Sequence, residues 1–182
     1  NKPISIIKLK NSKPDIVDFI NEEKWIIGCQ DTSPPIIITQ DKILTPIDIT
    51  NKKFFATSIK KSSAGKLFIG NLNGKPIIIE NQSSNEINLP TESTYDCAWI
   101  SDEYLIISCY RNNKILLIKL SGRSATIIQS IDIVYPYRFS PIINSKVILT
   151  ARGWKERPGK VFILQIEYEK EFITNKLIPK IK

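Results

Sequence analysis

A short apolar phrase that ends in a small residue occurs four times in this chain. The copies are KWIIGC (24–29), KLFIGN (66–71), YLIISC (104–109) and KVILTA (146–151). The small residues at their ends are Gly28, Gly70, Ser108 and Thr150. Their spacings of 42, 38 and 42 residues give a period near 40, which is typical of repeat architectures. The pattern inside each unit then has to distinguish a helical repeat from a β repeat.

Each unit contains three further segments of β type around the repeated phrase. First segments precede it at 15–20, 54–59, 95–100 and 136–140. Third segments follow it at 35–39, 75–80, 114–120 and 160–166, and fourth segments close the units at 43–49, 86–90, 125–133 and 172–181. Isoleucine dominates these segments, and β-branched residues suit a pleated, buried surface. Polar turns such as Asn73-Gly74 and Asn112-Asn113 tolerate positive φ and favour tight hairpins between the second and third segments.

Four strands per unit, in tandem with this period, are typical of propeller blades. We therefore predict an all-β fold, a single β-propeller domain over residues 1–182 built of about four four-stranded antiparallel blades. The segment 3–10 is expected to be an outer strand of a preceding or closing blade. The expected blades cover about 15–50, 54–90, 95–133 and 136–181.

The number of blades bears on how the ring closes. Four blades can close a small ring, but four blades in an open arrangement would expose two sheet edges, which invite mispairing. We expect the chain to be part of a larger ring that another segment or another chain completes. A closed four-bladed ring is the alternative.

One blade unit resembles a known group of repeats. The segment WISDEYLIISCYRNNKILLIKL (99–120) has a turn, an apolar strand with a small ending, a polar hairpin and a second apolar strand, and so resembles WD40-like β-propeller blades. Two motifs of that group are missing, because the chain has no histidine for the Gly-His pair and no Trp-Asp pair after the third segments. The segment is also similar to blades of bacterial surface and lactonase-like propellers. The resemblance implies the propeller architecture and no specific family.

Charge and cysteine content limit the compartment and the partners. The formal net charge is +8, but lysines are spread along the chain and no block of like charges marks a dedicated polyanion site. The three cysteines, Cys29, Cys97 and Cys109, lack metal-ligand spacing and favour a reducing compartment, so we expect an intracellular, cytoplasmic or nuclear protein. No apolar run reaches the roughly 18 residues of a membrane helix, and no membrane partner is expected.

The residue types argue against several catalytic chemistries. Without histidine, a Ser-His-Asp triad, a Cys-His pair and a His-ligated metal are excluded. Asp96, Asp102 and Glu103 could form a carboxylate site, or could instead bind the backbone at strand ends and turns. No glycine-rich phosphate loop is present. We expect no enzyme activity, no cofactor and no metal.

Binding residues gather in the loops that a propeller places on one face, namely the turns between second and third strands and the links between blades. Trp154 lies in one such turn, and tryptophan and arginine are common at the centres of interfaces. Alternatively, Trp154 caps its own blade and the cations face solvent, whereas Trp25 and Trp99 are expected in the core. The predicted partner-binding residues are Trp154, Arg152, Lys155, Arg157, Arg111, Asn112, Tyr135, Tyr137 and Arg138.

Three function classes are compatible with these residues. The leading expectation is a non-enzymatic protein-interaction scaffold, a propeller subunit of a larger assembly that binds protein partners through its loop face. The first alternative is an RNA- or DNA-associated propeller that uses a basic-aromatic surface, because aromatic side chains stack on bases. The second alternative is a propeller hydrolase or lactonase with a carboxylate-metal site.

Overall fold

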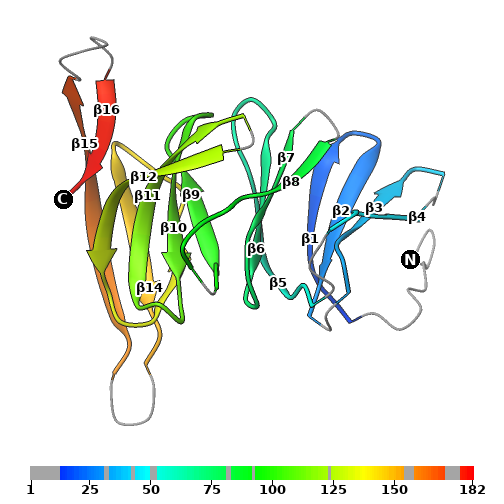
Figure 1. Ribbon diagram of the computed structural model, residues 1–182, viewed down its shortest axis with the longest axis horizontal. Helices are drawn as coiled ribbons and strands as arrows, with labels where there is room; N and C mark the ends of the chain where they lie inside the picture. The colour runs from blue at the N-terminus through cyan, green and yellow to red at the C-terminus, as the bar shows by residue number, and fades with distance from the viewer. Residues whose placement is uncertain are drawn as a thin grey trace, which may run out of the picture.

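The computed structural model describes residues 13–30, 33–41, 44–49, 53–80, 83–91, 93–122, 124–153, 158–170 and 177–182. These residues form four four-stranded antiparallel sheets and no helix (Figure 1). The predicted segment 3–10 lies outside the described residues. Within the described residues, no helix has the length and apolar character needed to cross a membrane.

Each sheet consists of four strands that are consecutive in the chain. The first sheet contains β1 (Pro14–Asn21), β2 (Lys24–Cys29), β3 (Ile36–Thr39) and β4 (Leu44–Pro46), and the second contains β5 (Ala56–Lys61), β6 (Leu67–Asn71), β7 (Ile77–Glu80) and β8 (Ser83–Glu86). The third contains β9 (Asp96–Trp99), β10 (Tyr104–Cys109), β11 (Lys114–Ser121) and β12 (Ser124–Asp132), and the fourth contains β13 (Pro136–Phe139), β14 (Lys146–Ala151), β15 (Lys160–Lys170) and β16 (Leu177–Ile181). The predicted all-β class and four-sheet architecture are confirmed, and the repeated phrases are the second strands.

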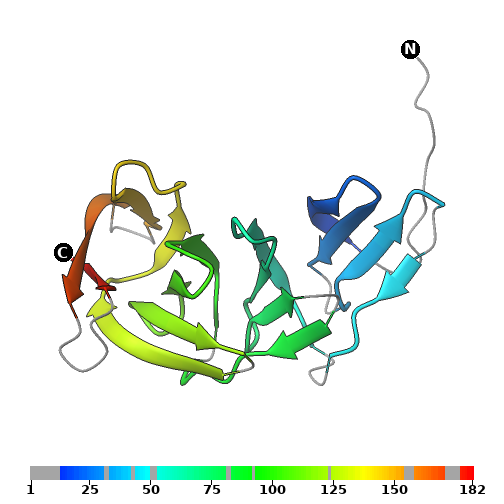
Figure 2. The ribbon, with the colours of Figure 1, turned by 90° about the horizontal axis from the view of Figure 1, so that it is seen from above.

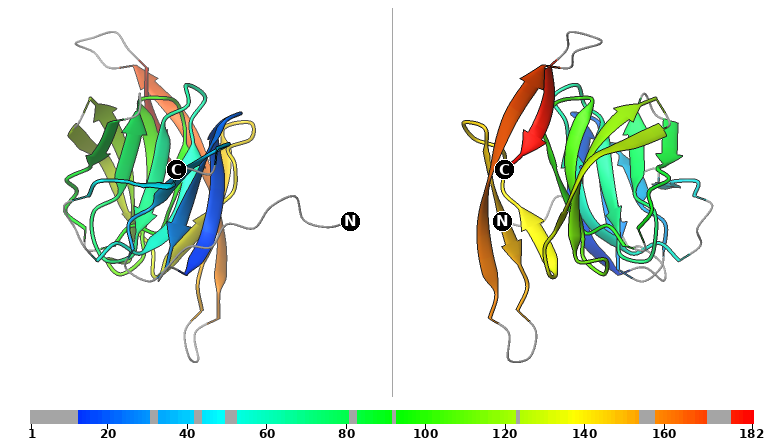
Figure 3. Two further views of the ribbon diagram at one scale, coloured as in Figure 1. Left: turned by 90° about the vertical axis from the view of Figure 1, so that its right-hand side faces the viewer. Right: turned by 60° about the vertical axis from the view of Figure 1, so that its left-hand side comes forward.

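The four sheets stand side by side in an arc. Seen from above, the first strand of each sheet lies on the concave side and the fourth strand on the convex side (Figure 2). The first strands contact one another from sheet to sheet, β1 with β5, β5 with β9 and β9 with β13. The fourth sheet is the tallest, since β15 and β16 extend beyond the neighbouring sheets (Figure 3). This arrangement places the ends of the second strands and the starts of the third strands on one side of the arc, together with the starts of the first strands. We call that side the loop face.

Apolar side chains fill the space between successive sheets in three clusters, one at each junction. In the two middle sheets, β6 and β10 are buried along their whole length because neighbours cover both faces. In contrast, β14 of the fourth sheet alternates between exposed and buried residues. Trp25, predicted to be a core residue, is 37% exposed, because it lies on the outward side of the first sheet. Trp99 is partly buried and packs against the cluster between the second and third sheets.

The close approach of neighbouring sheets explains the small residue at the end of the first three repeated phrases. A Cβ atom on Gly28 would lie 2.7 Å from the Cβ of Ala56 in the second sheet. A Cβ atom on Gly70 would lie 2.8 Å from the backbone oxygen of Tyr95, which leads into the third sheet. Ser108, which is fully buried, occupies the equivalent place in the third sheet. Larger residues at these positions would push the sheets apart.

Candidate binding site on the loop face

Four tyrosines from the third and fourth sheets meet on the loop face. We call Tyr95, Tyr110, Tyr135 and Tyr137 the tyrosine cluster. The ring centroids of Tyr95 and Tyr137 are 4.4 Å apart, those of Tyr95 and Tyr110 5.7 Å, and those of Tyr110 and Tyr135 5.4 Å. Aromatic pairs at these separations stabilise one another beyond the apolar area that they bury. The rings of the cluster are therefore packed against one another and form a partly buried surface.

Two arginines lie over this cluster. The guanidinium carbon of Arg138 is 5.0 Å from the ring centroid of Tyr95 and 5.5 Å from that of Tyr137. Arg152 lies 5.9 Å from the Tyr137 centroid. Among the described residues, no carboxylate forms an ion pair with Arg138. Stacking on an aromatic face orients a guanidinium, and a guanidinium is a planar donor group that matches the geometry of a carboxylate.

A hydrogen bond links the two central tyrosines. The hydroxyl oxygens of Tyr95 and Tyr137 are 2.8 Å apart. Burial raises the pKa of Tyr95 well above its ordinary value of 10. The hydrogen bond with Tyr137 and the electrostatic interaction with the same residue raise it further, and the charges of Arg138 and Arg152 oppose this rise only in part. Tyr95 therefore stays protonated throughout the physiological range and supplies no negative charge to the cluster.

The backbone around the cluster is fixed by side-chain and main-chain hydrogen bonds. Asn113, with a φ of 53°, accepts through Oδ1 from the backbone N–H of Tyr135 at 3.0 Å. Tyr135 has a φ of 50°, and its carbonyl oxygen accepts from the N–H of Arg152 at 2.9 Å. Positive φ is tolerated best by asparagine and glycine among the residues of turns. The predicted Asn112-Asn113 turn thus orients the link between the third and fourth sheets.

The structure brings together four of the nine predicted partner-binding residues: Tyr135, Tyr137, Arg138 and Arg152. Arg111 points instead toward the second sheet, where its guanidinium donates to Asn73 Oδ1 at 3.4 Å. Asn112 accepts from the Thr91 hydroxyl at 2.7 Å and belongs to the framework of the loop. The three remaining predicted residues lie outside the described residues: Trp154, Lys155 and Arg157.

Two members of the cluster, Tyr95 and Tyr110, were missed by the sequence analysis. The repeat itself contains the signal. Tyr95 enters a first strand as Tyr137 does in the next unit, and Tyr110 stands two residues after Ser108, as Arg152 stands two residues after Thr150. Because equivalent positions in successive units meet at a junction, an alignment of the four units would have marked both tyrosines.

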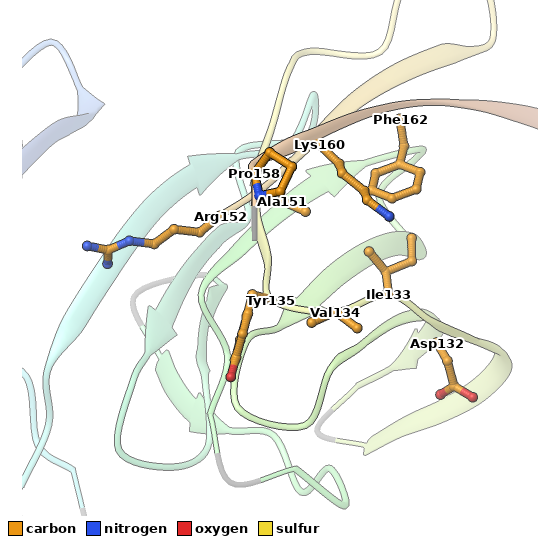
Figure 4. A pocket seen from close by; sticks show the side chains of 9 residues that line it. All are labelled: Asp132, Ile133, Val134, Tyr135, Ala151, Arg152, Pro158, Lys160 and Phe162. Carbon is orange, nitrogen blue, oxygen red and sulfur yellow. The ribbon is translucent and has the colours of Figure 1, made fainter. Parts of the chain in front are cut away.

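A cavity of about 550 Å³ opens beside the cluster, between the link to the fourth sheet and the start of β15. Tyr135 and Arg152 contribute to its wall and belong to the cluster surface as well. Figure 4 shows Ile133 and Val134 on one side of the cavity and Phe162 on the other, with the Arg152 side chain directed away from them. The cavity is thus mainly apolar, and three charged residues also line it, namely Asp132, Arg152 and Lys160.

The candidate carboxylate site has a different character from the one considered in the sequence analysis. Asp96 is completely buried; its Oδ2 accepts from the N–H of Phe139 at 2.8 Å, and its Oδ1 lies 3.9 Å from the Lys60 ammonium without a hydrogen-bond partner. Burial raises the pKa of Asp96, and the bond from Phe139 and the charge of Lys60 oppose that rise. Asp96 thus ties the third sheet to the fourth.

Asp102 lies at the other end of β9, in the turn before β10. Its carboxylate accepts from the N–H of Ala64 at 2.8 Å, and this bond lowers its pKa. Glu103 beside it is exposed. Asp96 and Asp102 therefore do not face a common site. Across the described ranges, no three His, Cys, Asp or Glu side chains gather closely enough to hold a metal ion.

Comparison with known proteins identifies the architecture. No protein-family model and no curated protein matches the sequence. Among solved structures, a streptogramin B lyase aligns with a TM-score of 0.66 and 19% identity over 88% of this chain and 58% of its own. The fold is a β-propeller. The chain thus spans less than two thirds of that lyase.

Two further structures show how varied such neighbours are. The computationally designed Ika4 protein aligns with a TM-score of 0.65 and 14% identity over 89% of this chain and 98% of its own. The β-propeller domain of Cps50 (Swd1) from Myceliophteria thermophila aligns with a TM-score of 0.56 and 10% identity over 85% of this chain and 54% of its own. At these identities the likeness concerns the fold alone, because propellers host unrelated activities.

Proposed function

We propose that this protein is a non-enzymatic binding module of a larger assembly, and that its loop face takes an acidic segment of a protein partner. The observation that carries the proposal is the stacking of Arg138 over Tyr95 and Tyr137, with Arg152 beside them. Tyrosine and arginine are enriched among residues that dominate binding energy.

The geometry suits a preformed site. The tyrosine cluster is held by ring contacts and by the 2.8 Å hydroxyl bond between Tyr95 and Tyr137, so few rotamers have to be fixed when a partner binds. Reducing that entropic cost raises affinity without additional contacts. The partner's carboxylates would accept from the arginine N–H groups, and an apolar side chain next to them would enter the cavity lined by Ile133, Val134 and Phe162.

A catalytic role has weaker support. The chain contains no histidine. The carboxylate of buried Asp96 accepts from the backbone N–H of Phe139, and the carboxylate of Asp102 accepts from the backbone N–H of Ala64. The similarity to a streptogramin B lyase at 19% identity transfers no activity to this chain.

The test measures the affinity of acidic peptides that carry one aromatic residue, together with versions in which glutamine replaces each glutamate. We expect Arg138→Ala and Arg152→Ala each to weaken binding of the acidic peptides by roughly 30-fold, the equivalent of about 2 kcal/mol at a dominant contact. Arg111→Ala is the matched control, because Arg111 lies on the same face but contacts Asn73 instead of the cluster. Equal affinities for all three variants, or for acidic and glutamine peptides, would contradict the proposal.

Single-stranded nucleic acid is the second candidate, supported by the net charge of +8. The tyrosine rings are tilted by 31–43° against one another, with centroids 4.4–5.7 Å apart, and Arg138 lies over two of them. These contacts leave less ring surface for a base, which favours the protein partner. A salt titration separates the two, since each phosphate contact steepens the salt dependence of binding. Tight oligonucleotide binding that falls steeply with salt and is lost in Arg138→Ala would favour nucleic acid.

A further inference from the structure

The front face of the fourth sheet, meaning the side that a following sheet would cover, is apolar and uncovered. In the third sheet, Ile106 and Leu117 pair across β10 and β11 and pack against the fourth sheet, with no exposed surface. The equivalent pair in the fourth sheet is Ile148 and Ile163. These side chains are 45% and 69% exposed. The fourth sheet thus presents the same packing surface as the third, without a neighbour on it.

The back face of the first sheet is uncovered in the same way. Phe139 of the fourth sheet packs on the third sheet and is 5% exposed. Val17 occupies the equivalent register position in the first sheet, since each pairs with the residue just before the small residue of its repeat, and Val17 is 66% exposed. Phe19 and its cross-strand partner Trp25 extend this apolar surface. Exposed apolar surfaces of this kind mark interaction sites.

A second feature of the fourth sheet also favours the packing of another sheet on its front face. At the junction between the third and fourth sheets, the hydroxyl of Ser108 donates to the backbone oxygen of Tyr137 at 3.1 Å. The last sheet keeps a small hydroxyl residue, Thr150, at the position of Ser108, although Thr150 is exposed. A small residue at this position serves close sheet packing in the other three units, so its presence here fits a sheet that packs in the same manner.

We propose that a second copy of this chain covers both faces. The fourth sheet of each copy packs on the first sheet of its partner, and a two-fold axis through the concave side of the arc closes the ring. Two copies, each with the four sheets that the structure describes, give eight sheets, which is within the usual range of propeller blades. Unlike faces meet at both contacts, and closure at the second contact prevents growth into a filament.

Several observations favour a second copy as the occupant. The missing neighbour has to offer a back face to the fourth sheet and a front face to the first, and this chain carries one of each. At an existing junction the turns between first and second strands meet, with Ala64 donating to Asp102. At the open ends, the corresponding turn of the first sheet holds Glu22 and Glu23, and Lys146 begins β14 directly after the turn of the fourth sheet. All three are exposed, and their charges are complementary.

The first test is the mass of the purified chain in solution, measured by size-exclusion chromatography with light scattering. We expect two chains of 20.8 kDa in one particle. Ile163→Asp and Val17→Asp each place a charge in a proposed contact, and each should reduce the particle to one chain with an unchanged circular dichroism spectrum. Ile127→Asp is the matched control, because Ile127 is a partly exposed residue of the third sheet remote from both faces, and the dimer should persist.

The second test checks which faces meet. By equivalence with the Ser108–Tyr137 contact, Thr150 of one copy should lie beside Asp15 of the other. A short bismaleimide should therefore join Thr150→Cys chains to Asp15→Cys chains in a mixture, and should join neither variant to itself. The native cysteines are buried and should not react in the folded protein.

Three outcomes would overturn the proposal. A monomer at all concentrations would mean that other sheets, or another protein, cover the faces. A dimer that survives both aspartate substitutions would lie elsewhere on the molecule. Cross-linking of either single-cysteine variant to itself would indicate like faces in contact, which leaves the ring open.

Discussion

The hydroxyl of Ser108 in β10 donates a hydrogen bond to the backbone oxygen of Tyr137 in β13, 3.1 Å away on the next sheet. The same hydroxyl accepts from the N–H of Asp96 at 2.9 Å. One buried side chain therefore joins three strands from two sheets. The contact connects the repeat seen in the sequence with the loop face, because Tyr137 belongs to the tyrosine cluster.

Replacing Ser108 by alanine should destabilise the junction between the third and fourth sheets. The change leaves the N–H of Asp96 and the carbonyl of Tyr137 with less hydrogen bonding in a buried place, which costs about 1–3 kcal/mol. Urea unfolding of Ser108→Ala and the parent protein measures this difference. Ser130→Ala, in the exposed part of β12, serves as the control and should lie within about 0.5 kcal/mol of the parent.

Gly70→Val should have a larger effect than an equally sized change at the surface. The new Cβ would lie 2.4 Å from the Thr57 hydroxyl and 2.8 Å from the Tyr95 backbone oxygen, and backbone gives way poorly. Overpacking of this kind costs about 1–3 kcal/mol or more. Thermal unfolding monitored by circular dichroism checks the prediction against Ser130→Val. An unchanged melting temperature in Gly70→Val would show that the sheets are not tightly apposed there.

Asp96 should make stability fall as pH rises above the ordinary carboxyl value near 3.8. Burial raises the pKa of Asp96 in the folded protein, so the folded state holds this proton more tightly than the unfolded state. The free energy of unfolding then decreases with pH from about 3.8 up to the raised value. Asp96→Asn has no titrating carboxyl at this position. The free energy of unfolding of Asp96→Asn minus that of the parent protein should therefore increase across that pH interval and stay constant above it. Urea unfolding of both proteins at a series of pH values provides the measurement.

Tyr95 should resist ionisation in the folded protein. Its pKa is raised mainly by burial and then by the bond to Tyr137, so the neutral form is favoured and stability declines as pH climbs above the ordinary value of 10. In an absorbance titration at alkaline pH, Tyr95→Phe should remove a tyrosine that otherwise ionises only on unfolding. If the variant instead lost a tyrosine that titrates near 10, the cluster would be open to water.

The tyrosine cluster should be cooperative. Tyr95→Phe and Tyr137→Phe each break the 2.8 Å hydroxyl contact, so the double variant should cost less than the sum of the single variants. We expect a coupling free energy of about 1 kcal/mol, within the range of residues in direct contact. Thermal unfolding of the four proteins completes the cycle, and strict additivity would exclude the bond.

The sequence by itself determined the strands and their grouping. Runs of β-branched residues between polar turns specify strands wherever they occur, and the period near 40 residues set by Gly28, Gly70, Ser108 and Thr150 groups them in fours. Four predicted binding residues also lie together on one face, because equivalent loops of successive repeat units lie on the same side of the fold. Local propensity and spacing suffice for such features, since they depend on neighbours in the chain.

Only the tertiary structure decided how the sheets sit against one another. It exposed Trp25, a large aromatic residue expected in the core, which lies on a face that none of the four described sheets covers. It separated Asp96 from Asp102 at opposite ends of β9, and it brought Tyr95 and Tyr110 into the cluster. The reason is physical: burial and contact depend on which sheet lies opposite, and that is set by packing between segments far apart in the sequence.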